Sequence, residues 1–471
     1  MRKTKIVCTI GPASESEEML KELCLAGMNV ARLNFSHGTH AEHLERINRI
    51  KKVRAELGLP IAIMLDTKGP EFRIGTFKDG KVILEEGAKF TFTTEEVEGD
   101  DTIVSVSYKN LANELEKGDR ILLNNALLEF EVLSTDGTNI VTEVIEGGEL
   151  SNRKSMSFPG KHMQQIYLSE QDKSDIAFGV ENDVDFIACS FVSVKQDLVD
   201  VHEYLKALGK DDTVELIAKI ENQSGYDNID EICSQCDGIM VARGDMGVEI
   251  PFERLPAIQK DLIFRCRMIG KRVITATEML ESMIHNPRPT RAETSDVANA
   301  VYDGTSAVML SGETAAGEYP VHAVKAMAKI AEEAEHNIDY KKQFYQYDFK
   351  IKNDMDAISH ATCGMAMDVD ADAIVACTMS GRVAKMVSRF RSPIDIIGLT
   401  TNEKTWRSLA LSWAVTPKMC EIVPSTEVLF YMAKKAAIEA MSLKSGNKIV
   451  ITGGGTTGIS GNTNLIKIET I

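Results

Sequence analysis

Residues 5–35 read KIVCTIGPASESEEMLKELCLAGMNVARLNF and decide the fold class. Two β-branched runs, at 5–10 and 29–35, flank an amphipathic segment at 16–27, in which Ser16 is a helix-capping residue and Gly27 a helix stop. A strand, a helix and a second strand in this order are typical of parallel strands joined by a crossover helix.

The same alternation continues to about residue 345. Six further runs complete a set of eight predicted strands: IAIMLD (61–66), DFIACS (185–190), ELIAKI (215–220), GIMVAR (238–243), RVITAT (272–277) and SAVMLS (306–311). Eight β/α units predict a closed (β/α)8 barrel, the TIM barrel. Such barrels carry their chemistry at the carboxyl ends of the strands, so candidate site residues are expected there.

One barrel unit is interrupted by about a hundred residues, because the next helical pattern after residue 66 begins near Ser169. The interruption contains four alternating runs: KFTFTT (89–94), TIVSVS (102–107), LEFEVLS (128–134) and NIVTEVI (139–145). Alternation with period two predicts strands, and hence a small all-β domain inserted at the catalytic rim, where it can act as a lid.

Shorter α/β units resume near residue 346 and predict an open-sheet α/β domain at the C-terminus. We therefore expect three domains: the barrel at 1–69 and 168–345, the inserted β domain at 70–167, and the C-terminal domain at 346–471.

The composition is that of a folded protein, with 44% hydrophobic and 26% charged residues among 471. A net charge of −17 repels nucleic acid and anionic membranes, so neither is an expected partner. No apolar run is long enough for a signal peptide or a membrane span, and nine scattered cysteines do not form a disulfide framework. We expect a soluble, cytoplasmic protein with free thiols.

Polar residues end each predicted barrel strand. Lys219 and Glu221, two residues apart, face the same way, which puts an ammonium beside a carboxylate. Asp245 closes the next strand, so two carboxylates on neighbouring strands can hold one Mg²⁺ that keeps waters for its substrate. A salt-bridged strand end is the alternative for Lys219 and Glu221.

A second group offers hydroxyl, amide and carboxylate oxygens with one formal charge: Asn34, Ser36, Asp66 and Thr67. This donor set suits a monovalent cation, although a hydrogen-bonded turn network is an alternative. Arg32 and Arg73 flank the two groups, and guanidinium is well shaped to bind phosphate. The rim is therefore expected to receive a multiply anionic, phosphorylated substrate.

Six segments, in this order, resemble the pyruvate kinase family: ARLNFSHGTH (31–40), MLDTKGPEFR (64–73), LIAKIENQSG (216–225), IMVARGDMGVEIP (239–251), ATEMLESMI (276–284) with PRPTRAETSDVANAVYDG (287–304), and LSGETAAGEYP (310–320). The resemblance implies a cytoplasmic, homotetrameric glycolytic phosphotransferase. It would move a phosphoryl group from phosphoenolpyruvate to ADP, giving pyruvate and ATP, with Mg²⁺ (or Mn²⁺) and K⁺ as cofactors.

The resemblance also implies a role for each matching residue. It makes Glu221 and Asp245 the Mg²⁺ ligands and Asn34, Ser36, Asp66 and Thr67 the K⁺ ligands. The implied phosphoryl-binding residues are Arg32, Arg73 and Lys219, and the implied substrate-carboxylate site comprises Gly244, Asp245 and Thr277. The implied nucleotide contacts are Thr9, Pro12, Asn34, His37, Arg73 and Lys154, and Thr277 and Ser311 are candidates for protonating the enolate through water. Glu71 stands where K⁺-independent members carry a lysine, so K⁺ should be required.

Two regions bear on regulation. The residues Thr378, Ser380, Gly381 and Arg382 follow a strand and open a helix, which makes them either a plain N-cap or an anion site. The resemblance implies a sugar-phosphate effector there, working with the loop at 460–464. In the inserted domain, Asn124-Asn125-Ala126 replaces the family's usual Asp-Asp-Gly, and the return linker at 158–176 lacks its second Leu-Pro.

Two other functions are compatible with part of these features. A metal-dependent lyase or aldolase acting on pyruvate enolates would share the barrel and the metal, but has no role for Arg32, Arg73 and the K⁺ group. A non-catalytic phosphometabolite sensor would not need Lys219, Glu221 and Asp245.

Overall fold

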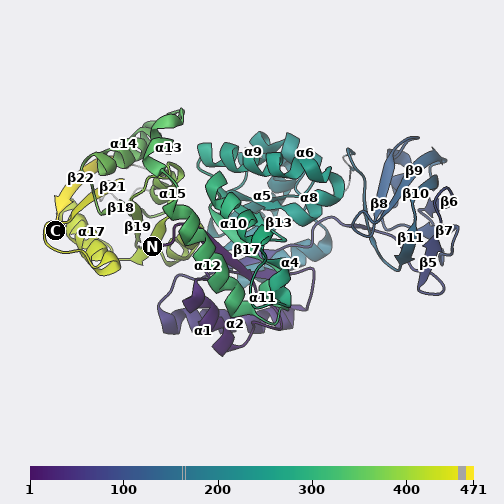
Figure 1. The fold of residues 1–471 in the computed structure, drawn as a ribbon, viewed down its shortest axis with the longest axis horizontal. Helices are drawn as coiled ribbons and strands as arrows, with labels where there is room; N and C mark the ends of the chain where they lie inside the picture. The colour runs from purple at the N-terminus through teal and green to yellow at the C-terminus, as the bar shows by residue number, and fades with distance from the viewer. Residues whose placement is uncertain (162, 165, 455–462) are drawn as a thin grey trace.

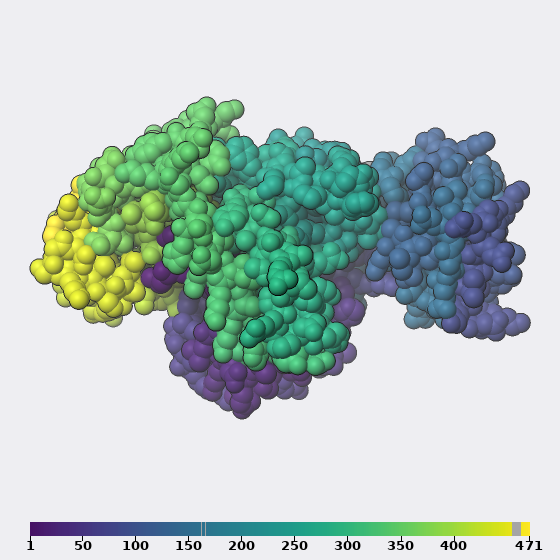
Figure 2. Space-filling view, in the orientation of Figure 1, coloured from purple at the N-terminus to yellow at the C-terminus, as the bar shows by residue number. Residues whose placement is uncertain are grey.

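The computed structural model describes residues 1–161, 163–164, 166–454 and 463–471. These residues form three bodies in a row, with the barrel in the middle, the inserted β domain at one end and the C-terminal α/β domain at the other (Figure 1). The inserted domain projects from the barrel, at the opposite end of the molecule from the C-terminal domain (Figure 2). The predicted fold class is confirmed; the exact domain boundaries stay a prediction.

The barrel is a closed parallel sheet in the order β1-β17-β16-β15-β14-β13-β3-β2. Its strands agree with the eight predicted runs to within one residue at each end: β1 (Lys5–Thr9), β2 (Val30–Asn34), β3 (Ala62–Asp66), β13 (Phe186–Cys189), β14 (Glu215–Ile220), β15 (Gly238–Ala242), β16 (Arg272–Ala276) and β17 (Ala307–Leu310). The runs are nearly continuously apolar because helices cover the outer face and side chains fill the inside.

Helices surround the barrel: α1 (Glu17–Ala26), α2 (His40–Leu57), α4 (Glu170–Glu181), α5 (Lys195–Ala207), α6 (Gln223–Asp227), α7 (Ile229–Cys233), α8 (Arg243–Glu249), α9 (Leu255–Met268), α10 (Arg291–Asp303), α11 (Gly312–Ala315) and α12 (Pro320–His336), with short 3-10 helices at Asp211–Thr213, Phe252–Arg254 and Glu281–Ile284. The expected signals act at the ends of α1, because the Ser16 side chain accepts a hydrogen bond from the Met19 N–H and Gly27 adopts a positive φ of 124°. Ser169 caps α4 where the barrel resumes.

Leu411, from the C-terminal domain, belongs to the core cluster that fills the inside of the barrel. It is fully buried there with barrel-strand residues such as Val7, Phe186 and Met240. The C-terminal domain thus contributes a side chain to the barrel's own core.

The inserted domain is all-β apart from one turn of helix, α3 (Leu111–Glu114). A seven-stranded sheet in the order β4-β12-β8-β9-β10-β6-β7 lies beside a two-stranded sheet of β5 and β11. The strands are β4 (Phe72–Arg73), β5 (Lys81–Leu84), β6 (Lys89–Thr93), β7 (Ile103–Ser105), β8 (Arg120–Leu123), β9 (Leu128–Thr135), β10 (Asn139–Glu146), β11 (Gly148–Ser151) and β12 (Ser155–Ser157). Its core contains the fully buried rings of Phe90, Phe92 and Phe130.

The C-terminal domain has a five-stranded sheet in the order β20-β19-β18-β21-β22, in which only the pairing of β21 with β22 is antiparallel. Its elements are α13 (Tyr340–Gln346), α14 (Asp354–Asp368), β18 (Ala373–Cys377), α15 (Arg382–Arg389), β19 (Asp395–Thr400), α16 (Glu403–Ser408), a 3-10 helix (Leu409–Leu411), β20 (Val415–Met419), α17 (Thr426–Met441), β21 (Lys448–Gly454) and β22 (Thr463–Thr470).

The nine cysteines are free, as expected, and eight of them are buried. Within the described ranges, no helix combines the length and the apolar run that crossing a lipid bilayer requires.

Candidate active site

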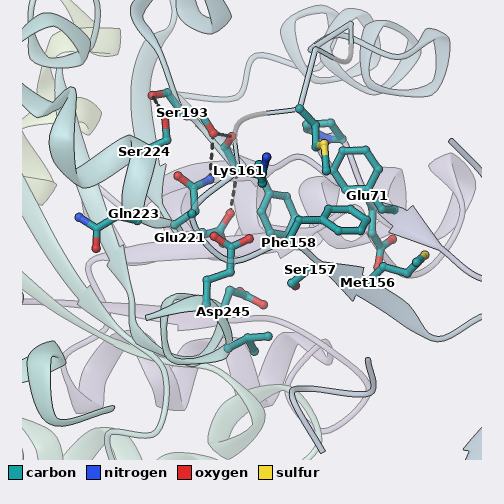
Figure 3. Close-up of a pocket in the computed structure, with 18 of the residues that line it drawn as sticks. Glu71, Met156, Ser157, Phe158, Lys161, Ser193, Glu221, Gln223, Ser224 and Asp245 are labelled. Atoms are coloured by element: carbon teal, nitrogen blue, oxygen red, sulfur yellow. Dashed lines mark hydrogen bonds between the residues drawn. The ribbon is translucent and has the colours of Figure 1, made fainter. Parts of the chain in front are cut away.

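A cavity of about 480 Å³ opens where the inserted domain meets the carboxyl ends of β14 and β15. Glu221 and Asp245 of the barrel point into this space, and Phe158 and Lys161 of the inserted domain approach it from the other side (Figure 3). The inserted domain therefore forms one wall of a site whose other wall is the barrel rim.

Lys219 is the centre of a buried network at this rim. Its Nζ atom lies 3.0 Å from Asp66 Oδ1, 2.7 Å from Ser190 Oγ and 3.0 Å from Glu221 Oε1. Burial lowers the pKa of Lys219, but the carboxylates of Asp66 and Glu221 outweigh burial and raise it above its ordinary value. Lys219 is thus a permanent positive charge at the mouth of the barrel, facing Glu221 as the sequence spacing predicts.

Asp66 joins this lysine to a buried arginine. Arg32 Nε lies 2.6 Å from Asp66 Oδ2, and Arg32 Nη1 donates a 2.9 Å hydrogen bond to Thr9 Oγ1. Burial raises the pKa of Asp66, but the positive charges of Arg32 and Lys219 bring it below its ordinary value. The ionised carboxylate of Asp66 therefore holds the positively charged side chains of Arg32 and Lys219 next to each other.

Glu221 and Asp245 both line the cavity, and Glu221 is paired with Lys219, as the salt-bridged alternative also requires. Burial raises the pKa of Glu221 to about 7, repulsion from Asp245 adds to this shift, and Lys219 opposes it. One correction concerns Asp245, which lies in the first turn of α8 and not at the end of a strand. Among the described residues, no cluster of three or more His, Cys, Asp or Glu side chains is placed to hold a metal.

The predicted monovalent-cation group is tied into hydrogen bonds with the protein. Asn34 Oδ1 accepts from the Ser36 N–H at 3.1 Å, and Thr67 Oγ1 accepts from the Ser190 N–H at 3.1 Å. Asp66 and Thr67 are buried, whereas Ser36 is exposed. Both the turn-network alternative and a cation site agree with this arrangement, because each accepting oxygen retains a second lone pair.

Thr277 follows β16 in a left-handed conformation, with φ at 69°, and the next residue, Glu278, has φ at 53°. A β-branched residue is a genuine outlier at such angles, which cost about 1–3 kcal/mol. Arg243 holds the turn, because its Nη2 donates a 2.5 Å hydrogen bond to the Thr277 carbonyl. The Gly244 N–H, which is one of the predicted donors to the substrate carboxylate, donates a 2.7 Å hydrogen bond to the Thr277 hydroxyl oxygen in this structure.

Ser311, the second candidate for the proton step, follows β17. Within the described part of the chain its buried hydroxyl oxygen has no hydrogen-bond partner. Its backbone N–H donates 2.7 Å to Glu313 Oε2, which fixes the turn that carries it. The Ser311 hydroxyl is therefore one hydrogen bond short, although Ser311 does not line the cavity itself.

The remaining predicted contacts come from several elements. Arg73, in β4, donates a 2.6 Å hydrogen bond to the Arg153 carbonyl and forms an ion pair with Glu71. Lys154 is half-buried in the inserted domain, whereas Pro12 and His37 are exposed on barrel loops. The predicted nucleotide contacts thus come from both domains.

The predicted effector residues lie where β18 leads into α15. Gly381 is the N-cap of α15 with φ at 78°, and Ser380 and Arg382 are exposed. In the companion loop, Thr463 and Asn464 begin β22, whereas residues 460–462 lie outside the described residues. The effector assignment stays a prediction.

The sequence places Ser190 and Arg243 among the polar residues that end barrel strands but assigns them no role, and it gives no indication of the Phe191 N–H. Ser190 Oγ accepts from Lys219, and the Phe191 N–H donates 2.5 Å to Glu221 Oε2. A polar residue at the end of β13 was a usable signal for Ser190. The Phe191 N–H is a backbone group, so no residue type in the sequence could indicate its role.

These features define the class of the protein: a (β/α)8-barrel enzyme with an inserted β domain, a C-terminal α/β domain, and a buried Lys219–Asp66–Arg32 network beside a cavity lined by Glu221 and Asp245. Two family descriptions match the chain, "Pyruvate kinase, barrel domain" over residues 1–324 and "Pyruvate kinase, alpha/beta domain" over residues 356–469. The chain belongs to the pyruvate kinase family, as its six sequence segments predict.

Individual relatives agree with this assignment. The pyruvate kinase of Staphylococcus saprophyticus is 50% identical over all of this chain and 81% of its own length. That of Clostridium acetobutylicum is 46% identical over the full length of both proteins. A crystal structure of a pyruvate kinase from Cryptosporidium parvum superposes with a TM-score of 0.95 at 37% identity, covering all of this chain and 96% of that one. Neither alternative function is favoured by these matches.

Proposed function

We propose that this chain transfers the phosphoryl group of phosphoenolpyruvate to ADP, giving pyruvate and ATP. The observation that carries the proposal is the buried, permanently charged Lys219, held between Asp66 and Glu221, of which Glu221 lines the cavity beside the inserted domain. The migrating group is highly anionic, and charge stabilisation by fixed donors is the main source of rate enhancement in phosphoryl transfer.

Arg32 and Lys219 are the proposed phosphoryl-binding residues. Asp66 fixes both side chains, so no reorganisation is needed when negative charge develops between them. The bond between phosphorus and the enol oxygen breaks as a terminal ADP oxygen binds phosphorus, which leaves the enolate of pyruvate. Arg73 would complete the cationic group from the lid side.

The enolate then takes a proton on carbon. The proposed donors, acting through water, are the Thr277 hydroxyl and the buried Ser311 hydroxyl, which has no partner among the described residues. Thr277 is held in a strained turn by Arg243, so its position is defined before the substrate binds.

Glu221 and Asp245 are the proposed Mg²⁺ ligands, with Mn²⁺ as a substitute. They fit a hard divalent cation, because both are oxygen donors and both line the cavity. When bound, Mg²⁺ would neutralise charge on the substrate oxygens. The oxygens of Asn34, Ser36, Asp66 and Thr67 are the proposed K⁺ ligands. The family resemblance supports a K⁺ requirement, because Glu71 stands where K⁺-independent members carry a lysine.

The test is pyruvate formation, followed by coupling to lactate dehydrogenase, with phosphoenolpyruvate and ADP in the presence and absence of Mg²⁺ and K⁺. Activity that requires both cations supports the proposal. An absence of pyruvate under every cation condition would refute the proposal and favour the alternative of a non-catalytic phosphometabolite sensor. Pyruvate released without ADP would favour the lyase or aldolase.

Four further properties are proposals from the family resemblance. A cytoplasmic homotetramer predicts a solution mass near four times the 51.9 kDa chain mass, which light scattering measures. A sugar-phosphate effector at Thr378, Ser380, Gly381 and Arg382 predicts that Arg382→Ala abolishes activation by that ligand and leaves basal turnover unchanged. The division at residues 69, 167 and 345 predicts preferred proteolytic cleavage near these positions.

A further inference from the structure

Tyr167 lies in the return segment, residues 158–169, which leads the chain from the lid back into the barrel. It is 6% exposed, it lines the cavity, and its hydroxyl donates a 2.7 Å hydrogen bond to the backbone carbonyl of Ser190. The same segment contributes Phe158 and Lys161 to the cavity wall (Figure 3). One buried phenol therefore joins the lid connection to the end of β13.

The turn that Tyr167 contacts holds both members of the Lys219–Glu221 pair. The Ser190 hydroxyl accepts from Lys219 Nζ at 2.7 Å, and the Phe191 N–H donates to Glu221 Oε2 at 2.5 Å. Phe191 achieves this in a left-handed conformation, with φ at 55°, which is unfavourable for a bulky residue. The strained conformation persists only if the surrounding structure fixes the turn.

The contact is chemically suited to fixing this turn. Burial raises the pKa of Tyr167 well above its ordinary value, so the phenol stays a hydrogen-bond donor at neutral pH. Its partner is a backbone oxygen, so the bond fixes the main chain itself. Without this donor the buried Ser190 carbonyl would have no hydrogen-bond partner among the described residues, and the adjoining left-handed Phe191 would lose a fixed neighbour.

We propose that Tyr167 is a positioning residue, which holds the Ser190–Phe191 turn so that Lys219 and Glu221 keep their places in the site. The inference rests on the proposed function, because it assigns Tyr167 an effect on metal binding and on phosphoryl transfer. Tyr167 touches neither reacting atom and acts only through the turn. Its place in the return segment also makes the site sensitive to how the lid is attached.

The test compares Tyr167→Phe with Tyr204→Phe. Tyr204 is a matched control, because its hydroxyl also donates to a backbone carbonyl, that of Lys173 at 3.0 Å, on the outer helices of the barrel. Each variant loses one hydroxyl and keeps its ring. Mn²⁺ affinity is measured by electron paramagnetic resonance without substrates, together with kcat, the two KM values and the thermal midpoint.

We expect Tyr167→Phe to weaken Mn²⁺ binding by about 10-fold, the typical loss when a support of a metal ligand is removed, and to lower kcat. Tyr204→Phe should shift the thermal midpoint by a similar amount and leave Mn²⁺ binding and kcat unchanged. Equal Mn²⁺ affinity in both variants would overturn the proposal. If the unmodified protein forms no pyruvate, the proposed function fails, and the Mn²⁺ measurement still decides whether Tyr167 positions Glu221.

Discussion

Replacing Lys219 by methionine tests the charge balance of the active site most directly. The change keeps the length of the side chain and removes its charge, so Glu221 loses its only cationic contact among the described residues and Asp66 keeps only Arg32. Removal of a fixed charge that stabilises the transferring group typically costs about 10²-fold or more in turnover. We expect kcat to fall by at least that factor.

The stability effect should depend on pH, because the pKa of Glu221 is already raised to about 7. Glu221 ionises near pH 4.5 in the unfolded chain, so its burial costs folding free energy that accumulates as pH rises from there to its folded pKa. Without Lys219 that folded pKa rises further. The stability gap between wild type and Lys219→Met should therefore widen above pH 7 by up to about 1.4 kcal/mol per pH unit.

The assay is the coupled pyruvate assay for turnover and thermal denaturation in chelator between pH 6 and 9 for stability. Lys173→Met is the control, since Lys173 pairs with Glu170 at the protein surface, where solvent screens the salt bridge and leaves it little effect on stability. A kcat within tenfold of wild type would refute the assigned role of Lys219. A stability gap that does not change with pH would refute the charge balance.

Three other changes probe the packing and the backbone. Leu411→Ala should lower the free energy of unfolding by about 2–5 kcal/mol and speed hydrogen exchange in the barrel strands. Leu409→Ala, equally buried in the C-terminal core, should speed exchange only in the C-terminal domain, and faster exchange confined to that domain in both variants would contradict the prediction. Burial lowers the pKa of Lys5 to about 7, so unfolding takes up a proton and the wild type should gain thermal stability relative to Lys5→Met from pH 7 to 9, by at most about 2.7 kcal/mol; a constant difference would argue against it. Ala126→Gly should stabilise the lid by about 0.5–1 kcal/mol in thermal denaturation, because Ala126 has φ at 61°, and destabilisation would refute this.

The barrel could be predicted from the sequence because its eight strands are buried on both faces and read as short apolar runs. The β/α boundaries were equally clear, since Ser16 and Ser169 cap helices and Gly27 ends one. Boundaries in the C-terminal domain were less accurate. There, the run TPKMCEI (416–422) predicts a strand, which the structure has over Val415–Met419. The pattern at 402–412 predicts a helix, which is an α-helix only over Glu403–Ser408.

The candidate site could be predicted wherever side chains carry the chemistry. Lys219 and Glu221 face each other because strand residues two apart share a face. The supports could not be predicted, because the Phe191 N–H and the Ser190 carbonyl are backbone groups whose direction depends on a left-handed residue. Tyr167 likewise acts through a residue 23 positions away in sequence, which no local pattern reveals.

The lid leaves the barrel after β3 and returns to it through α4 and β13, and these two strands are neighbours in the sheet. The Ser190 N–H donates a hydrogen bond to Thr67 Oγ1, so the residue that follows β13 is bonded to the residue that follows β3, where the chain leaves for the inserted domain. Loop-closure entropy rises only slowly with length, so an excursion of this size adds little to the cost of assembling the barrel. In evolution, such a module can be enlarged, shortened or exchanged while the enzyme beneath it goes on folding in the same way.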